Sequence, residues 1–145
     1  MNAMKNVLVP VDGSESALRA VQWVSGQLAG QAGAHVHLLT VVPAVDAWEV
    51  RSHLGGDDIA RIEAGNAASV LDPAVAVVRA AGVAVSPHSA AGADVAASIA
   101  EHARTCQCDS IVMGVRGLTA LKSVLLGSTT LKVIHLANVP VTVVK

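Results

Sequence analysis

Short runs rich in valine, leucine and isoleucine recur along the chain, and longer stretches with apolar residues at helical spacing separate them. A continuous apolar run without polar alternation is typical of a strand that is buried on both faces of a sheet. The predicted strands are 6–11, 34–42, 83–88, "DSIVMG" at 109–114 and "VPVTVVK" at 139–145. The resulting order, β-α-β-α-β-α-β-α-β, predicts an α/β fold whose mainly parallel sheet has helices on both faces and right-handed crossovers.

The segments between these runs predict four helices. Ser14 is a suitable N-cap for a helix over 15–30, with Ala17, Val21, Val24 and Leu28 on its apolar face and Gly30 or Gly33 at its end. Asp57 or Asp58 can cap a long helix that lasts to about Ala81, and Gly65 and Pro73 suggest an interruption in it. The other two helices are expected over 94–104 and 128–137, and 43–56 is expected to be an irregular connection.

Length and composition limit the function classes. The 145 residues, 52% of them apolar, suffice for one core, so residues 1–145 are expected to form a single domain. A net charge of −1 offers no basic surplus for the phosphates of DNA or RNA, so a nucleic-acid partner is not expected. The chain contains neither an apolar run long enough for a membrane span nor a signal-peptide pattern, and a cytoplasmic protein is expected.

The cysteines and histidines do not have the spacing of a known metal site. Cys106 and Cys108 are too few for a disulfide framework and are expected to be ordinary reduced cysteines at a helix end. His35 and His37 share one face of a strand, but no H-E-x-x-H pattern or Cys/His cluster accompanies them in the sequence. Surface or packing roles are expected for the histidines, and no metal site is predicted.

The stretch "MGVRGLTALKSVLLGSTT", residues 113–130, is the strongest functional signal. Gly114 and Gly117 follow the fourth strand, where glycine can take positive φ or let the backbone approach a ligand closely. Gly127, Ser128 and Thr129 open the last helix, whose free N–H groups and dipole form an anion site. An open parallel sheet binds its ligand beyond the carboxyl ends of its strands, so Asp12-Gly13, 40–43 and the segment from Gly114 onward are the places to look.

Other interpretations of these residues stay open. Gly114 can be a plain strand-to-loop turn and Ser128 an ordinary N-cap, while Arg116 and Lys122 can either pair with phosphates or stay solvated. The chain lacks a Walker A loop, and no G-x-G-x-x-G follows the first strand. Asp12 is an acceptor suited to the hydroxyl or amine groups of a nucleoside. A role for Asp12 as a phosphoacceptor is disfavoured, because the sequence lacks the neighbouring acidic pair that would hold Mg²⁺.

Three segments, "NVLVPVDGSESALRAVQWV", "SIVMGVRG" and "GSTTLKVIHLANVPVTVV", resemble the universal stress protein family. The pattern G-2x-G-9x-G-[ST] of its ATP-binding branch is matched in full by Gly114, Gly117, Gly127 and Ser128. The resemblance implies a Rossmann-like, adenine nucleotide alpha hydrolase-like domain with five parallel strands in the order 3-2-1-4-5. It also implies a homodimer formed through the C-terminal strand.

The same resemblance implies roles for individual residues. Asp12 would contact the adenosine part, Val41 would contact adenine through its backbone, and Gly114 would lie against the ribose. The complete set of expected nucleotide-binding residues is Pro10, Val11, Asp12, Val41, Met113, Gly114, Arg116, Gly117, Gly127, Ser128 and Thr129. The cofactor would be ATP, or AMP or ADP, with or without Mg²⁺.

Three functions therefore remain under consideration. The first is a dimeric stress-response regulator that binds ATP, hydrolyses it slowly at most, and acts on a protein partner not identified by the sequence. The second is a nucleotide-free dimeric binding module of the same fold. The third is a weak ATP phosphohydrolase, which is disfavoured because no residue has the setting of a base or nucleophile for fast phosphoryl transfer. The intact glycines and Ser128 favour the first.

Overall fold

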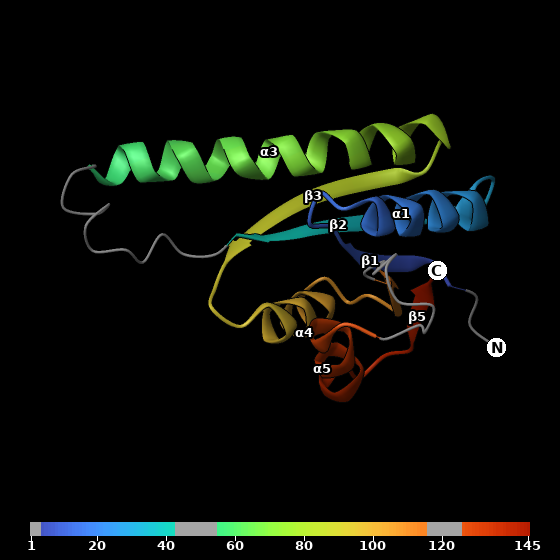
Figure 1. Cartoon of the computed structure of the whole chain (residues 1–145). Coiled ribbons are helices and arrows are strands. Elements are labelled where there is room, and N and C mark those ends of the chain that lie inside the picture. The colour runs from blue at the N-terminus through green and yellow to red at the C-terminus, as the bar shows by residue number, and fades with distance from the viewer. Residues whose placement is uncertain (1–3, 43–54, 116–125) are drawn as a thin grey trace.

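The computed structural model describes residues 4–42, 55–115 and 126–145. Strands and helices alternate along these residues, as predicted (Figure 1). The strands are β1 (Asn6–Pro10), β2 (His35–Val42), β3 (Ala84–Ala91), β4 (Ser110–Gly114) and β5 (Val141–Val144). The helices are α1 (Glu15–Leu28), α3 (Gly56–Ala80), α4 (Val95–Thr105) and α5 (Ser128–Leu136).

The strands form one parallel sheet in the order β3-β2-β1-β4-β5, which confirms the expected topology. Helices α1 and α3 lie on one face of the sheet, and α4 and α5 lie on the other (Figure 1). Strand order reverses between β1 and β4, because the chain leaves β1 toward β2 and later returns to β1's other side. This reversal is the topological switch point at which open α/β sheets bind ligands.

Alternating side chains of β1 divide the core into two layers. Val7 and Val9 pack with the cluster under α1 and α3, whereas Leu8 packs with Ile99 of α4 and Ile111 of β4 on the other face. All five side chains are at most 1% exposed. Burial of one such side chain contributes about 1.5–3 kcal/mol, so both layers hold the sheet between its helices.

Helix α1 follows the sequence prediction closely. The Ser14 hydroxyl accepts a hydrogen bond from the Ala17 N–H at 3.2 Å and caps the helix. The predicted apolar face is buried, and the helix ends at Leu28, two residues before Gly30, which has φ +78°. A left-handed conformation of this kind favours glycine and directs the chain out of the helix.

Helix α3 departs from the prediction at both its start and its middle. It begins at Gly56 with Gly55 as N-cap and no side-chain capping bond, so the capping role given to Asp57 or Asp58 is wrong. It also continues through Gly65 and Pro73 without interruption. Pro73 is exposed, and the next residues pack on the core, including Val75 and Val78. This packing offsets the hydrogen bond that proline removes.

Strand β3 extends to Ala91, three residues past the predicted end at His88. Its last residues pair with β2 in register, Ser89 with Thr40 and Ala91 with Val42. Two of the three added residues are alanine, which has low strand propensity, so only pairing with β2 reveals this extension. Cys106 is the C-cap of α4, and Cys106 and Cys108 are free thiols, as predicted. Among the described residues, no helix has the length and apolar character to cross a membrane.

Candidate functional site

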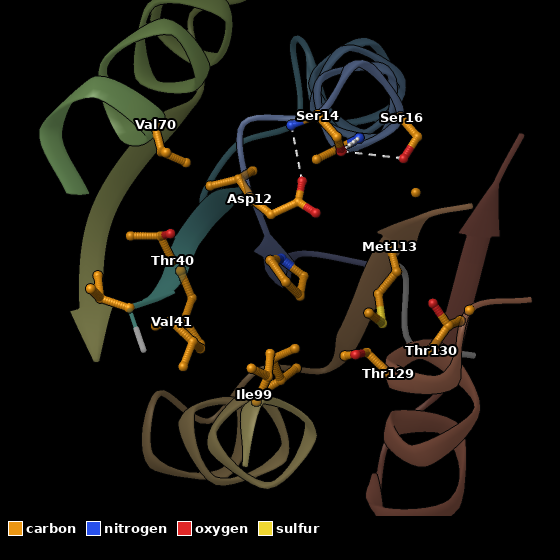
Figure 2. Close-up of a pocket in the computed structure, with 18 of the residues that line it drawn as sticks. Asp12, Ser14, Ser16, Thr40, Val41, Val70, Ile99, Met113, Thr129 and Thr130 are labelled. Carbon is orange, nitrogen blue, oxygen red and sulfur yellow. Dashed lines mark hydrogen bonds between the residues drawn. The ribbon is translucent and has the colours of Figure 1, made fainter. Parts of the chain in front are cut away.

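A cavity of about 450 Å³ opens at the carboxyl ends of the strands, at the switch point between β1 and β4 (Figure 2). This volume lies within the usual range for small-molecule sites. The lining comes from all four described helices or their caps and from β1, β2 and β4. It consists of Pro10, Val11, Asp12, Ser14, Ser16, Ala17, Leu39, Thr40, Val41, Val42, Asn66, Val70, Val95, Ile99, Met113, Gly114, Gly127, Ser128, Thr129 and Thr130.

Asp12 stands two residues after the end of β1, at the entry to α1. Its Oδ1 accepts a hydrogen bond from the Ser14 N–H at 3.0 Å, as Figure 2 shows. A bond from a carboxylate to the backbone two residues on stabilises a turn, and Gly13 completes it with φ +86°. The Asp12 side chain is exposed and lines the cavity, so its carboxylate can accept hydrogen bonds from a bound hydroxyl or amine.

Gly114 ends β4 in an extended conformation, and the positive φ that the sequence suggested for it is not observed. A Cβ at this position would lie 2.2 Å from the Ser16 carbonyl oxygen and 2.9 Å from the Ala17 backbone nitrogen. Glycine is therefore required here because the end of β4 approaches the first turn of α1. The sequence predicted that the backbone at Gly114 approaches a ligand closely. In the described structure, this backbone approaches the backbone of α1, beside the cavity.

The first turn of α5 supplies backbone donors to the cavity. Gly127 is the N-cap and makes no side-chain capping bond, and the first helical bond runs from the Leu131 N–H to the Gly127 carbonyl. The N–H groups of the first turn therefore precede the helical ladder and can donate to a ligand. Because the positive end of the helix dipole lies at the same place, this turn favours an anionic group.

Apolar side chains close the cavity from both faces of the sheet. Val70 comes from α3 and Ile99 from α4, while Val41 and Met113 come from the ends of β2 and β4 (Figure 2). Such a wall accepts a flat, weakly polar group. Polar side chains line the rest of the cavity, at the N-termini of α1 and α5 and at Thr40 and Asn66.

Nine of the eleven residues expected to bind a nucleotide line this cavity. The other two, Arg116 and Gly117, lie outside the described residues, as does Lys122. The structure therefore brings together residues from the ends of β1, β2 and β4 and from the start of α5. Their predicted contacts with a nucleotide stay predictions.

Several lining residues were not predicted from the sequence. Asn66 and Val70 come from the middle of α3, and Val95 and Ile99 come from the first turns of α4. The i, i+4 spacing of Val95 and Ile99 marked an apolar helix face, but nothing local shows that one end of this face borders a cavity. Asn66 lies in an alanine-rich segment without any motif.

Comparison with known proteins decides the family. The model of the universal stress protein family matches residues 4–145. The chain belongs to the universal stress protein family. Universal stress protein MJ0531 of Methanocaldococcus jannaschii is 33% identical, in an alignment that covers 99% of this chain and 84% of that protein.

Solved structures of this family share the fold. The hypothetical protein MJ0577 superposes with a TM-score of 0.78 at 29% identity, covering 98% of this chain and 96% of that one. The universal stress protein from Archaeoglobus fulgidus in complex with dAMP superposes with a TM-score of 0.69 at 26% identity, covering all of both chains. Universal stress proteins of this architecture thus include one that binds an adenine nucleotide.

Proposed function

We propose that this universal stress protein binds an adenine nucleotide, with ATP as the preferred ligand, in the cavity at the switch point. The observation that carries the proposal is that one cavity of suitable volume has an apolar wall on one side and hydrogen-bond donors on another. An apolar wall lies at Val41, Ile99 and Met113, and the donor-rich N-terminus of α5 opens into the same space. The dAMP complex of the Archaeoglobus fulgidus relative supports the same ligand class.

The proposed binding mode follows from these positions. The adenine ring would lie between the apolar side chains, and Asp12 would accept hydrogen bonds from the nucleoside. The phosphates would reach the first turn of α5, where the backbone N–H groups of Ser128 and Thr129 would donate to them. A Mg²⁺ ion accompanying the phosphates would take oxygen ligands from the phosphates themselves.

We propose that the protein acts as a regulatory homodimer rather than as a fast phosphohydrolase. Rapid phosphoryl transfer needs positive charge placed at the transferred phosphate. Within the described part of the lining, Asp12 is the charged side chain, and no lysine, arginine or histidine is present. The described site is therefore better suited to holding a nucleotide than to cleaving it. Nucleotide occupancy would then alter the surface offered to a protein partner.

Calorimetric titration of the purified protein with Mg·ATP, ADP and AMP tests the proposal. One nucleotide per chain with micromolar affinity is expected. Gly127→Val should weaken ATP binding at least about tenfold, because the valine side chain would occupy space beside the first turn of α5. Gly26→Val is the matched control, since a Cβ at Gly26 meets nothing within 4 Å and Gly26 does not line the cavity.

Circular dichroism must first show that both variants keep the fold. Unchanged ATP affinity in a folded Gly127→Val variant would refute the assigned site. If the wild-type protein binds none of the three nucleotides, the result would instead support the hypothesis of a nucleotide-free binding module.

A further inference from the structure

A second group of ligand-type side chains lies on the α4 face of the sheet, near the start of β2 and the middle of β3. Four of the six histidines gather there: His35 and His37 from β2, His88 from β3 and His102 from α4. The rings of His35 and His37 stack with centroids 4.2 Å apart, and the rings of His37 and His88 lie 5.3 Å apart. This face carries apolar residues farther along the strands, so a histidine cluster here is not explained by core packing.

Cys106 joins this cluster from the end of α4. Three ligand atoms lie within 4.8 Å of one another, one each from His37, His88 and Cys106. The nitrogens His37 Nδ1 and His88 Nε2 are 3.0 Å apart. Two nitrogens bound to the same tetrahedral zinc ion at 2.0–2.1 Å are separated by about 3.3 Å, so a small shift would place both on one ion.

The hydrogen bonds around Asn6 orient His37 as a ligand. The Asn6 side-chain amide donates to the carbonyl oxygens of Cys106 at 2.9 Å and Gln107 at 3.0 Å. Its Oδ1 must therefore accept, and it lies 2.9 Å from His37 Nε2, which donates its proton. The lone pair of His37 then lies on Nδ1, the atom that faces His88. Metal-binding histidines typically donate their second N–H to an oxygen in this way.

The same asparagine holds the turn that presents Cys106. Gln107 has φ +55°, a left-handed conformation that is uncommon for a residue other than glycine. The two bonds from Asn6, together with the bond from the Cys108 N–H to the Ala103 carbonyl, fix this turn. Cys106 also stands four residues after His102, so both lie on one face at the end of α4.

We propose that His37, His88 and Cys106 form a zinc site that joins β2 and β3 to the end of α4. Two imidazole nitrogens and one thiolate form a donor set that zinc prefers. A water molecule, or His102 after rotation of its side chain, would complete the four-coordinate shell. The ion would replace the hydrogen bond between His37 and His88. It would have a structural role, because it would link β2 and β3 to the end of α4.

The two imidazoles are in the form that binds a metal, whereas the Cys106 thiol must first lose its proton. Burial, followed by the neighbouring histidines, lowers the pKa of His37 to about 4, and burial also lowers the pKa of His88. Both imidazoles are therefore neutral at pH 7, the form that binds a metal. Burial raises the pKa of the Cys106 thiol, so metal binding would release its proton.

This site is separate from the nucleotide cavity. Neither His37, His88 nor Cys106 lines that cavity, although α4 contributes to both sites. Ile99 borders the cavity near the start of α4, and Cys106 lies seven residues later, about 10 Å farther along the helix axis. A zinc titration without nucleotide therefore tests this proposal independently of the proposed function.

The first experiment titrates the metal-free wild-type protein with Co²⁺, a spectroscopic substitute for Zn²⁺. We expect one Co²⁺ per chain, a thiolate charge-transfer band in the near ultraviolet, and loss of the spectrum when Zn²⁺ is added. Cys106→Ser should remove the charge-transfer band, and His37→Gln and His88→Gln should each lower the affinity at least about tenfold. The control is His135→Gln, an exposed position on α5, which should leave the spectrum and the affinity unchanged.

Absence of a charge-transfer band in the wild-type protein would overturn the proposal. A Cys106→Ser variant that binds Zn²⁺ as tightly as the wild type would overturn it as well.

A second measurement uses the wild-type chain alone and so does not depend on folded variants. Iodoacetamide should modify Cys106, and Zn²⁺ should slow this reaction at least about tenfold, as followed by peptide mass spectrometry. Cys108 serves as an internal control, because it is buried and burial raises its pKa to about 12, which keeps it unreactive with or without metal. A Cys106 rate that Zn²⁺ does not change would contradict the zinc site.

Discussion

Gly114 illustrates how a motif residue can have a structural reason besides its expected functional one. Its position at the end of β4 suggested contact with a ligand, and it does line the cavity. The structure adds that the missing side chain lets β4 meet the backbone of Ser16 and Ala17. The same glycine therefore shapes the cavity and permits α1 to pack beside β4.

We predict that Gly114→Ala destabilises the protein by about 2–3 kcal/mol, because its Cβ would lie 2.2 Å from the Ser16 carbonyl oxygen and backbone atoms must move to relieve the clash. Urea unfolding followed by circular dichroism measures the effect. Gly26→Ala is the matched control and should stabilise the protein by about 0.5–1 kcal/mol, since alanine favours a helix and meets no atom there. Equal stability of Gly114→Ala and the wild type would show that β4 and α1 can separate at little cost.

At the scale of the element, α3 shows how packing overrides local propensity. The sequence suggested a break at Gly65 and Pro73, yet the helix runs from Gly56 to Ala80. Buried residues recur in its second half at helical spacing, including Leu71, Ala74 and Val78. Their burial against β2, β3 and α1 keeps the helix continuous across the proline.

Replacement of Pro73 by alanine should therefore stabilise the protein. Proline in a helix interior removes one backbone hydrogen bond and crowds the preceding turn, and the gain on removing it should exceed the entropy that proline saves in the unfolded chain. We expect an increase of about 2 kcal/mol in the free energy of unfolding, measured in urea. Asp72→Ala, an exposed neighbour in the same helix, should change it by less than about 0.5 kcal/mol. A loss of stability in Pro73→Ala would mean that the helix is shaped around the proline.

At the scale of the whole molecule, the position of β5 at the sheet edge bears on assembly. The carbonyls of Pro140 and Val144 accept hydrogen bonds from the N–H of Ile111 in β4 and from the N–H of Val115, the residue after β4. Backbone groups alternate in direction along a strand, so those of Val141 and Val143 face away from β4. Within residues 4–42, 55–115 and 126–145, no other strand pairs with this outer row. Such a row can pair with another chain, and a two-fold axis would let β5 of two copies meet.

The proposed homodimer makes this edge testable by light scattering. Wild-type protein at micromolar concentration should have twice the mass of one chain. Val143→Pro removes an outward-facing N–H while leaving the bonds to β4 in place, and it should shift the mass toward that of a monomer. Val143→Ala keeps the N–H and should stay dimeric. A monomeric wild type, or a Val143→Pro variant that stays fully dimeric, would contradict pairing through β5.

The sequence by itself determined the order of elements, the parallel sheet and the motif positions of the cavity. These features depend on near neighbours: the apolar runs of the strands, the Ser14 cap, and the glycines at the end of β4 and just before α5. The cavity walls from α3 and α4 and the continuity of α3 were decided by tertiary packing. So was the cluster of His37, His88 and Cys106, which the spacing of cysteines and histidines did not predict.

The physical reason is separation along the chain. His37 and His88 are 51 residues apart, and Asn6 and Cys106 are 100 residues apart, yet each pair is in hydrogen-bond contact. The register of β1, β2 and β3 and the docking of α4 on them bring these groups together. No local pattern carries that register, because it results from burying both faces of the whole sheet at once.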